Sequence, residues 1–174
     1  MMLAPLIAFT ATPRYMSDGV AGVGQTLRQM RALVKVARIA PAIRQAATNI
    51  VWLTPEKDEY SECAALFEFV RDRIRYTRDI HEVETLATPE KTLEGMFGDC
   101  DDQTMLLCAL FESAGYGTRF VVAAYGDDSV FEPAFEHVYC QVFVCGEWID
   151  CDPTEQQAFG WAPPNPTRIA MEKI

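Results

Sequence analysis

A long apolar run between Gly98 and Gly115 is the strongest hydrophobic pattern in the chain. It predicts a helix over residues 100–114 that is apolar on almost every face. Asp99 suits the N-cap, because its side chain can accept hydrogen bonds from the free amides of the first turn, and Gly115 suits the left-handed position after the last turn. A helix that is apolar on most faces is normally buried. We therefore expect it at the centre of a domain, with Cys100 at its solvent-facing start.

Upstream of this run, apolar positions recur at three- and four-residue steps and predict further helices. We expect these from about residue 25 to Pro41, at 42–51, at 58–75 and, as a short turn of helix, at 90–96. Residues 1–22 show no period and predict an irregular arm, and residues 76–88 predict a loop.

Downstream of Gly115 the pattern changes to that of strands. Runs rich in β-branched and aromatic residues predict strands at 118–125, 135–144 and 148–152, separated by turns at 126–129 and 145–147. Helices followed by an antiparallel meander indicate an α+β fold, with the central helix packed on the sheet and extra N-terminal helices. We expect residues 1–55 to form an arm and helices packed on the core, 56–155 the core itself, and 156–174 a Pro-rich, extended C-terminal tail.

Charge is unevenly distributed over the 174 residues. The net charge is −10, yet residues 1–50 carry +5 and the remainder −15. An acidic body argues against nucleic acid as the main partner, because phosphate contacts need clustered Lys and Arg. The basic N-terminal segment is most simply a helix solvated on one face, or it could dock on this body or on an acidic protein partner. No apolar run is long enough to span a membrane, so we expect no membrane association.

Six cysteines occur in a chain that is too large to be a small disulfide scaffold. Cys63 and Cys108 fall on apolar helix faces, where free cysteine behaves as a small hydrophobe. We therefore expect a protein of the reducing cytoplasm.

Three residues could carry nucleophilic chemistry: Cys100 at the head of the central helix, His137 in the second strand and Asp152 at the end of the third. Neighbouring strands of a hairpin lie about 4.8 Å apart, so His137 and Asp152 can meet across it. If the helix start packs at the same edge, Cys100 attacks a carbonyl carbon, His137 relays the proton, and Asp152 holds the imidazole. Asp150 is the rival of Asp152 for the last role.

The pKa of the Cys100 thiol is subject to opposing effects. The helix N-terminus and an adjacent imidazolium lower it. The carboxylates of Asp99, Asp101 and Asp102 raise it, because each disfavours a second negative charge nearby. We expect a thiolate–imidazolium ion pair that depends on His137. The Cys100 amide would bind the oxyanion together with a second donor that the sequence does not identify.

A zinc site is the main alternative for the same strands. It would use His137, Cys140, Cys145 and Cys151, but their spacings lack the paired Cys-x2-Cys knuckles of such sites. The Asp-rich stretches lack an EF-hand pattern, so calcium is not indicated. No metal and no cofactor are expected. The other histidine, His81, lies in a charged loop.

Three blocks carry a family resemblance: Gly98-Asp-Cys-Asp-Asp102, Glu136-His-Val-Tyr139 and Gly146-Glu-Trp-Ile-Asp-Cys-Asp-Pro-Thr154. Together they resemble the transglutaminase-like superfamily, a branch of the papain-like thiol enzymes, over about residues 60–155. The resemblance implies a catalytic triad of Cys100, His137 and Asp152, and it favours Asp152 over Asp150. The stretch from Leu27 to Ala47 and the loop around Arg78 also resemble versions found in bacteriophage genomes.

Members of this superfamily act as protein cross-linkers, peptidases, amidases or deamidases, and some have lost the nucleophile. The resemblance therefore implies a thiol-dependent hydrolase of amide bonds, a cysteine peptidase or amidase acting on a protein or peptide through an acyl-thioester. Transfer of the acyl group to a lysine amine, as in transglutaminase cross-linking, is one alternative. A non-catalytic binding or assembly module is the other, and the basic N-terminal helix and Pro-rich tail would suit such a role.

Overall fold

The computed structural model describes residues 20–78, 86–125 and 136–174. The first 19 residues of the expected arm, the loop that holds His81 and the turn at 126–129 lie outside the described residues. In chain order the elements are α1 (Val20–Ala37), α2 (Pro41–Val51), α3 (Glu59–Arg73), β1 (Arg75–Tyr76), α4 (Pro89–Gly95), β2 (Phe97–Gly98), α5 (Cys100–Ala114), β3 (Gly117–Ala124), β4 (His137–Val144), β5 (Glu147–Cys151) and β6 (Arg168–Lys173).

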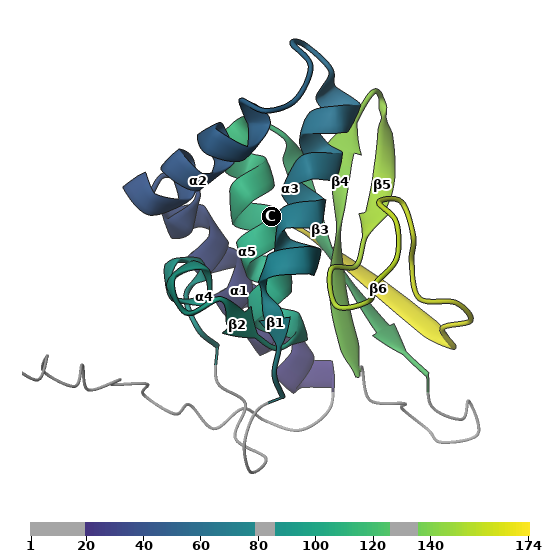
Figure 1. Ribbon diagram of the computed structural model, residues 1–174. Coiled ribbons are helices and arrows are strands. Elements are labelled where there is room, and N and C mark those ends of the chain that lie inside the picture. Colours follow the sequence, from purple (N-terminus) through teal and green to yellow (C-terminus); the bar gives the residue numbers. More distant parts are fainter. Residues whose placement is uncertain (1–19, 79–85, 126–135) are drawn as a thin grey trace, which may run out of the picture.

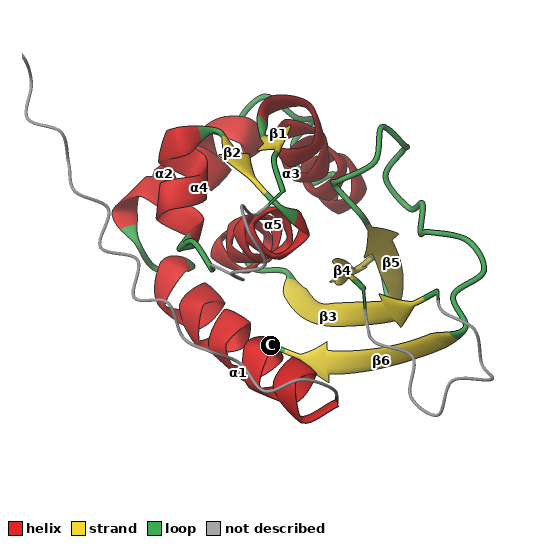
Figure 2. Cartoon of the chain, turned by 90° about the horizontal axis from the view of Figure 1, so that it is seen from below, coloured by secondary structure: helices red, strands yellow, loops and turns green. Residues whose placement is uncertain are grey.

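Helix α5 lies at the centre, between the other helices and the sheet (Figures 1 and 2). Its residues from Met105 to Phe111 are entirely buried. They share one hydrophobic core with the inward faces of α1, α2, α3, β3 and β4. This confirms the expected α+β architecture with a buried central helix. The boundary placed at residue 55 stays a prediction.

The main sheet has four antiparallel strands in the order β5-β4-β3-β6. The meander β3-β4-β5 confirms the three strands expected from the sequence. Ala123 pairs with His137, and Cys140 pairs with Cys151. His137 therefore stands at the start of β4, and Asp152 immediately follows the end of the neighbouring strand.

Two parts of the sequence reading were wrong. Helix α1 begins at Val20, five residues earlier than expected, because packing of Met30, Val34 and Ala37 in the core outweighs the cost of two early glycines. The tail was expected only to be extended, and its pairing was missed: its last part forms β6 and completes the sheet beside β3.

The C-terminal segment (residues 155–167) joins β5 to β6 and is fixed at both ends. Near its start, Arg71 of α3 donates to Gln157 O at 2.8 Å, and the Phe159 ring packs against Tyr60 and Phe67. At its end, the Thr167 amide donates to Ala124 O at 2.8 Å. The segment thus crosses from α3 to the far end of β3.

Within the described residues, no helix combines the length and apolarity that crossing a membrane requires.

Candidate active site

Hydrogen bonds fix the first turns of α5 against the start of β4. The Asp99 carboxylate caps the helix by accepting from the Asp102 amide at 3.1 Å, as the sequence predicted. One turn later, the buried Thr104 hydroxyl donates to Val138 O at 3.1 Å. Cys100 stands at the head of this helix, and His137 precedes Val138. The backbone amide of Val138 also hydrogen-bonds the Cys100 sulfur, which places the thiol beside the strand that carries His137.

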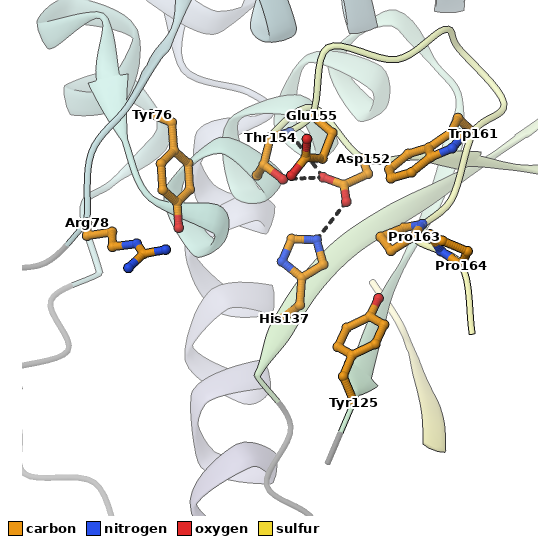
Figure 3. Close-up of a pocket in the computed structure, with 10 residues that line it drawn as sticks. All are labelled: Tyr76, Arg78, Tyr125, His137, Asp152, Thr154, Glu155, Trp161, Pro163 and Pro164. Carbon is orange, nitrogen blue, oxygen red and sulfur yellow. Dashed lines mark hydrogen bonds and ion pairs between the residues drawn. The ribbon is translucent and has the colours of Figure 1, made fainter. Parts of the chain in front are cut away.

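His137 and Asp152 are in direct contact. Nε2 of His137 lies 2.7 Å from Oδ2 of Asp152, whose side chain is fully buried (Figure 3). The other carboxylate oxygen accepts from the Thr154 amide at 3.0 Å and from its hydroxyl at 2.7 Å. Because the carboxylate can only accept, His137 Nε2 carries the hydrogen, and whenever the ring is neutral Nδ1 is the acceptor.

Asp150, the rival carboxylate, has a different partner. Its Oδ1 accepts from Gln141 Nε2 at 2.7 Å on the neighbouring strand. The structure therefore joins His137 to Asp152 and ties Asp150 into the sheet.

A pocket of about 440 Å³ opens at this point. His137 and Asp152 line it, whereas Cys100, which is partly buried, is not among its described lining residues. The remaining lining residues come from three separate regions: Tyr76 and Arg78 after α3, Tyr125 after β3, and Thr154, Glu155, Trp161, Pro163 and Pro164 from the chain after β5. Tyr76 and Arg78 lie across the pocket from Trp161 and the prolines (Figure 3).

The structure corrects the expected ion pair at the thiol. Burial raises the pKa of Cys100 well above its usual value, and the charges of Asp101 and Asp99 raise it further. The Val138 amide acts in the opposite direction but does not outweigh them. The thiol is therefore neutral at rest, with its sulfur 3.7 Å from Asp101 Oδ1.

The three aspartates around Cys100 have distinct roles. Asp99 caps the helix, and Asp102 is largely buried, where its Oδ1 accepts from the Ala87 amide at 2.8 Å. Asp101 is the carboxylate that contacts the thiol.

The four residues of the alternative zinc site are not brought together. His137 begins β4 and Cys145 follows its other end in an exposed turn, a separation of roughly 25 Å at the rise of an extended strand. No group of three or more His, Cys, Asp or Glu side chains with metal-binding geometry occurs among the described residues.

Sequence reasoning missed most of the pocket wall. Tyr76 and Trp161 lie outside every predicted hydrophobic period, and Tyr125 is the last residue of a predicted strand, so no local signal marked them as pocket residues. Tyr76 follows the apolar face of α3 by two residues, and Trp161 precedes a proline cluster. Only the spatial neighbours of His137 could have identified them.

Comparisons with known proteins agree with this fold. The family model of the transglutaminase-like superfamily matches residues 44–153, which is well over half of the chain. A search of curated proteins found no match.

Several solved structures share the architecture at low identity. A proposed cysteine protease from Cytophaga hutchinsonii is 14% identical, with a TM-score of 0.53 over 81% of this chain and 55% of that one. A proposed protease from Parabacteroides distasonis is 11% identical, with a TM-score of 0.57 over 76% of this chain and 27% of that one. Rad4–Rad23 bound to a 6-4 photoproduct UV lesion gives 12% identity and a TM-score of 0.52, over 79% of this chain and 39% of that one.

This chain thus spans about half or less of the length of each of these three structures, and at such identities the likeness shows the fold alone. The extent of the family match, together with the helix-and-sheet architecture, assigns the family. The chain belongs to the transglutaminase-like superfamily.

Proposed function

We propose that this protein is a thiol-dependent hydrolase of amide bonds in a protein or peptide, with Cys100 as nucleophile, His137 as general base and acid, and Asp152 as the residue that orients the imidazole. The observation that carries the proposal is the 2.7 Å contact between His137 Nε2 and the buried Asp152 carboxylate at the wall of a pocket. This contact leaves Nδ1 as the acceptor for a proton, on the residue that precedes Val138, to which α5 is hydrogen-bonded through Thr104.

The neutral thiol defines the first step. As the sulfur attacks the carbonyl carbon, its proton passes to His137 Nδ1, and the C=O electron pair moves to the oxygen. The backbone amide of Cys100 donates to that oxyanion. Collapse of the intermediate breaks the C–N bond, and His137 gives its proton to the leaving nitrogen. Water then hydrolyses the thioester, with His137 again acting as the general base. The Asp152 carboxylate stabilises the imidazolium that forms in each half-reaction.

Hydrolysis is preferred over transfer to a lysine amine. Water is always present, and transfer requires a site that holds an amine and excludes water. Besides His137 and Asp152, the pocket walls consist of three aromatic rings, two prolines, Thr154, Arg78 and Glu155, so one cation and one further carboxylate face the pocket. Amine transfer, which would cross-link proteins, remains the alternative reaction of the same thioester.

A non-catalytic binding module is the second candidate, and two observations favour it. The raised pKa of Cys100 makes the resting thiol a weak nucleophile. The same fold also occurs in Rad4–Rad23 bound to damaged DNA, so the fold does not by itself imply hydrolysis. The six cysteines are all free in the structure, and a reducing, cytoplasmic location would suit either candidate.

Acylation of Cys100 separates the enzyme from the binding module. We expect p-nitrophenyl acetate to acetylate Cys100 at least about 10²-fold faster than exposed Cys145, measured by nitrophenol release and site-resolved mass spectrometry. His137→Ala should abolish that advantage, whereas Cys145→Ala should leave the acetylation rate of Cys100 unchanged. Equal acetylation rates of Cys100 and Cys145 would contradict the proposal that this protein is an enzyme. With an unfolded protein as substrate, new peptide ends identify hydrolysis, whereas covalent dimers identify transfer.

A further inference from the structure

Strand β1 brings Tyr76 next to the head of the catalytic helix. Tyr76 pairs in parallel register with Gly98, two residues before Cys100. The adjacent Thr77 amide donates to Gly98 O at 3.0 Å, and the Arg75 amide donates to Met96 O at 2.9 Å. The residues on both sides of Tyr76 are thus hydrogen-bonded to the segment that leads into the nucleophile.

The side chain of Gln103 clamps this strand to α5. Its Nε2 donates to Gly98 O at 3.2 Å and to Ile74 O at 3.4 Å, and the residue is buried at 1% exposure. Gln103 lies within the first turn of α5, so the clamp ties β1, β2 and the helix start into one unit. The position of Tyr76 relative to Cys100 is therefore fixed by the fold.

The Tyr76 side chain points into the pocket. Its hydroxyl lies beside the Arg78 guanidinium, on the opposite side of the pocket from the His137 ring (Figure 3). A carbonyl carbon attacked by Cys100 has His137 on one side, so its oxygen must turn toward the helix start and the facing wall. Among the described pocket residues, Tyr76 carries a neutral O–H donor on that wall.

We propose that the Tyr76 hydroxyl is the second oxyanion donor, acting with the backbone amide of Cys100. This inference rests on the acyl-thioester chemistry proposed above. When the S–C bond forms, the carbonyl electron pair becomes an oxyanion that accepts from Cys100 N–H and Tyr76 O–H. When the C–N bond breaks, the pair returns to re-form C=O. Tyr76 keeps its own proton throughout, because the thiol proton travels through His137.

Two properties of Tyr76 suit that role. Burial and the nearby Cys100 and Asp99 raise the pKa of the phenol, which keeps the hydroxyl protonated as a donor. The neighbouring Arg78 acts in the opposite direction on the same pKa, and its cation also favours negative charge on the wall where the oxyanion would form.

The test compares two reactions of the same thiol. Acylation by p-nitrophenyl acetate passes through an oxyanion, whereas alkylation by iodoacetamide is a displacement at carbon and forms none. We expect Tyr76→Phe to lower the acylation rate constant of Cys100 by about 10- to 10²-fold, toward the lower end for an oxyanion donor because Tyr76 is 44% exposed. Alkylation of Cys100 should stay within about twofold of the wild-type rate. Tyr60→Phe, at a tyrosine of similar exposure outside the pocket (46%), is the matched control and should change neither rate.

Three outcomes would overturn the inference. If Tyr76→Phe acylates within twofold of the wild type, the hydroxyl does not stabilise the oxyanion. If acylation and alkylation fall together, Tyr76 supports the thiol or the fold. If the wild-type Cys100 is alkylated but never acylated, the proposed function itself fails and the oxyanion role fails with it. That last result is distinguishable, because it appears before any Tyr76 variant is made.

Discussion

The two halves of the candidate active site, the His137–Asp152 pair and the Cys100 thiol, differ in how far they are assembled at rest. On the sheet side, the His137 imidazole already contacts the buried Asp152 carboxylate, and Thr154 donates twice to that carboxylate. On the helix side, the Cys100 thiol is neutral, with a raised pKa and a carboxylate of Asp101 beside it. Under the proposed mechanism, this difference means that the base is assembled at rest, whereas the thiol must be ionised during the reaction.

The largest expected effect is at the assembled half. Asp152→Asn should lower kcat for p-nitrophenyl acetate hydrolysis by about 10²- to 10⁴-fold, because an amide can donate to Nε2 and so favour the wrong tautomer of His137. Asp150→Asn is the matched control. It removes a carboxylate two residues away that accepts from Gln141 instead, and it should change kcat by no more than a few fold. Comparable losses in the two variants would mean that the His137–Asp152 contact has no catalytic role.

At the thiol half, we expect a substitution to raise the reactivity of Cys100 instead of lowering it. Asp101→Asn removes a charge that raises the pKa of Cys100, so the thiolate fraction at neutral pH should increase. Because the wild-type pKa lies above its usual value, alkylation of Cys100 should still rise with pH beyond the range where an ordinary thiol levels off. In the variant the same profile should shift to lower pH by about one unit, which is about tenfold faster alkylation near pH 7.

Site-resolved iodoacetamide kinetics between pH 6 and 10 measures this shift. Glu147→Gln, at an exposed position of β5, is the charge-matched control and should leave the profile of Cys100 in place. A profile that is identical in wild type and Asp101→Asn would refute the claim that Asp101 holds the thiol protonated.

The smallest expected effect concerns the hydrogen bond that joins the two halves. Thr104→Val removes the bond to Val138 O and leaves that carbonyl without the hydroxyl, which should cost about 1 kcal/mol of unfolding free energy. Acylation by p-nitrophenyl acetate should also slow by a few fold as the helix start loosens against β4. Denaturant unfolding and the acylation rate give the two measurements.

Thr118→Val provides the comparison for Thr104. Thr118 is also buried and donates to Glu112 at 2.9 Å, at the other end of α5. It should lose similar stability and keep the acylation rate. A rate loss of equal size in both variants would show that stability alone, and not the alignment of Cys100 with His137, explains the effect.

The sequence predicted those parts of the molecule that have a strong local signal. The apolar run from Met105 to Phe111 is stable only when it is removed from water, so its pattern predicts burial. Each β-rich stretch after Gly115 pairs with the next stretch along the chain, as in a hairpin. The contact between His137 and Asp152 followed from that hairpin. These features depend on residues that are close together along the chain, so the sequence pattern predicts them.

The sequence analysis missed the features that depend on residues far apart along the chain. Strand β6 follows a proline cluster and pairs with β3 some 50 residues upstream, so its existence depends on the free edge of β3. Strands β1 and β2 have two residues each, too few for any period. The raised pKa of Cys100 is dominated by burial, which the spacing of charges along the chain does not report.

The C-terminal segment (residues 155–167) has a consequence for how the protein can be handled. Trp161, Pro163 and Pro164 form one wall of the pocket, and the segment that carries them is anchored downstream through Thr167 and the pairing of β6 with β3. We therefore expect that removing the final strand, or fusing a bulky tag that disrupts it, would leave Cys100, His137 and Asp152 in place while loosening one wall of the pocket.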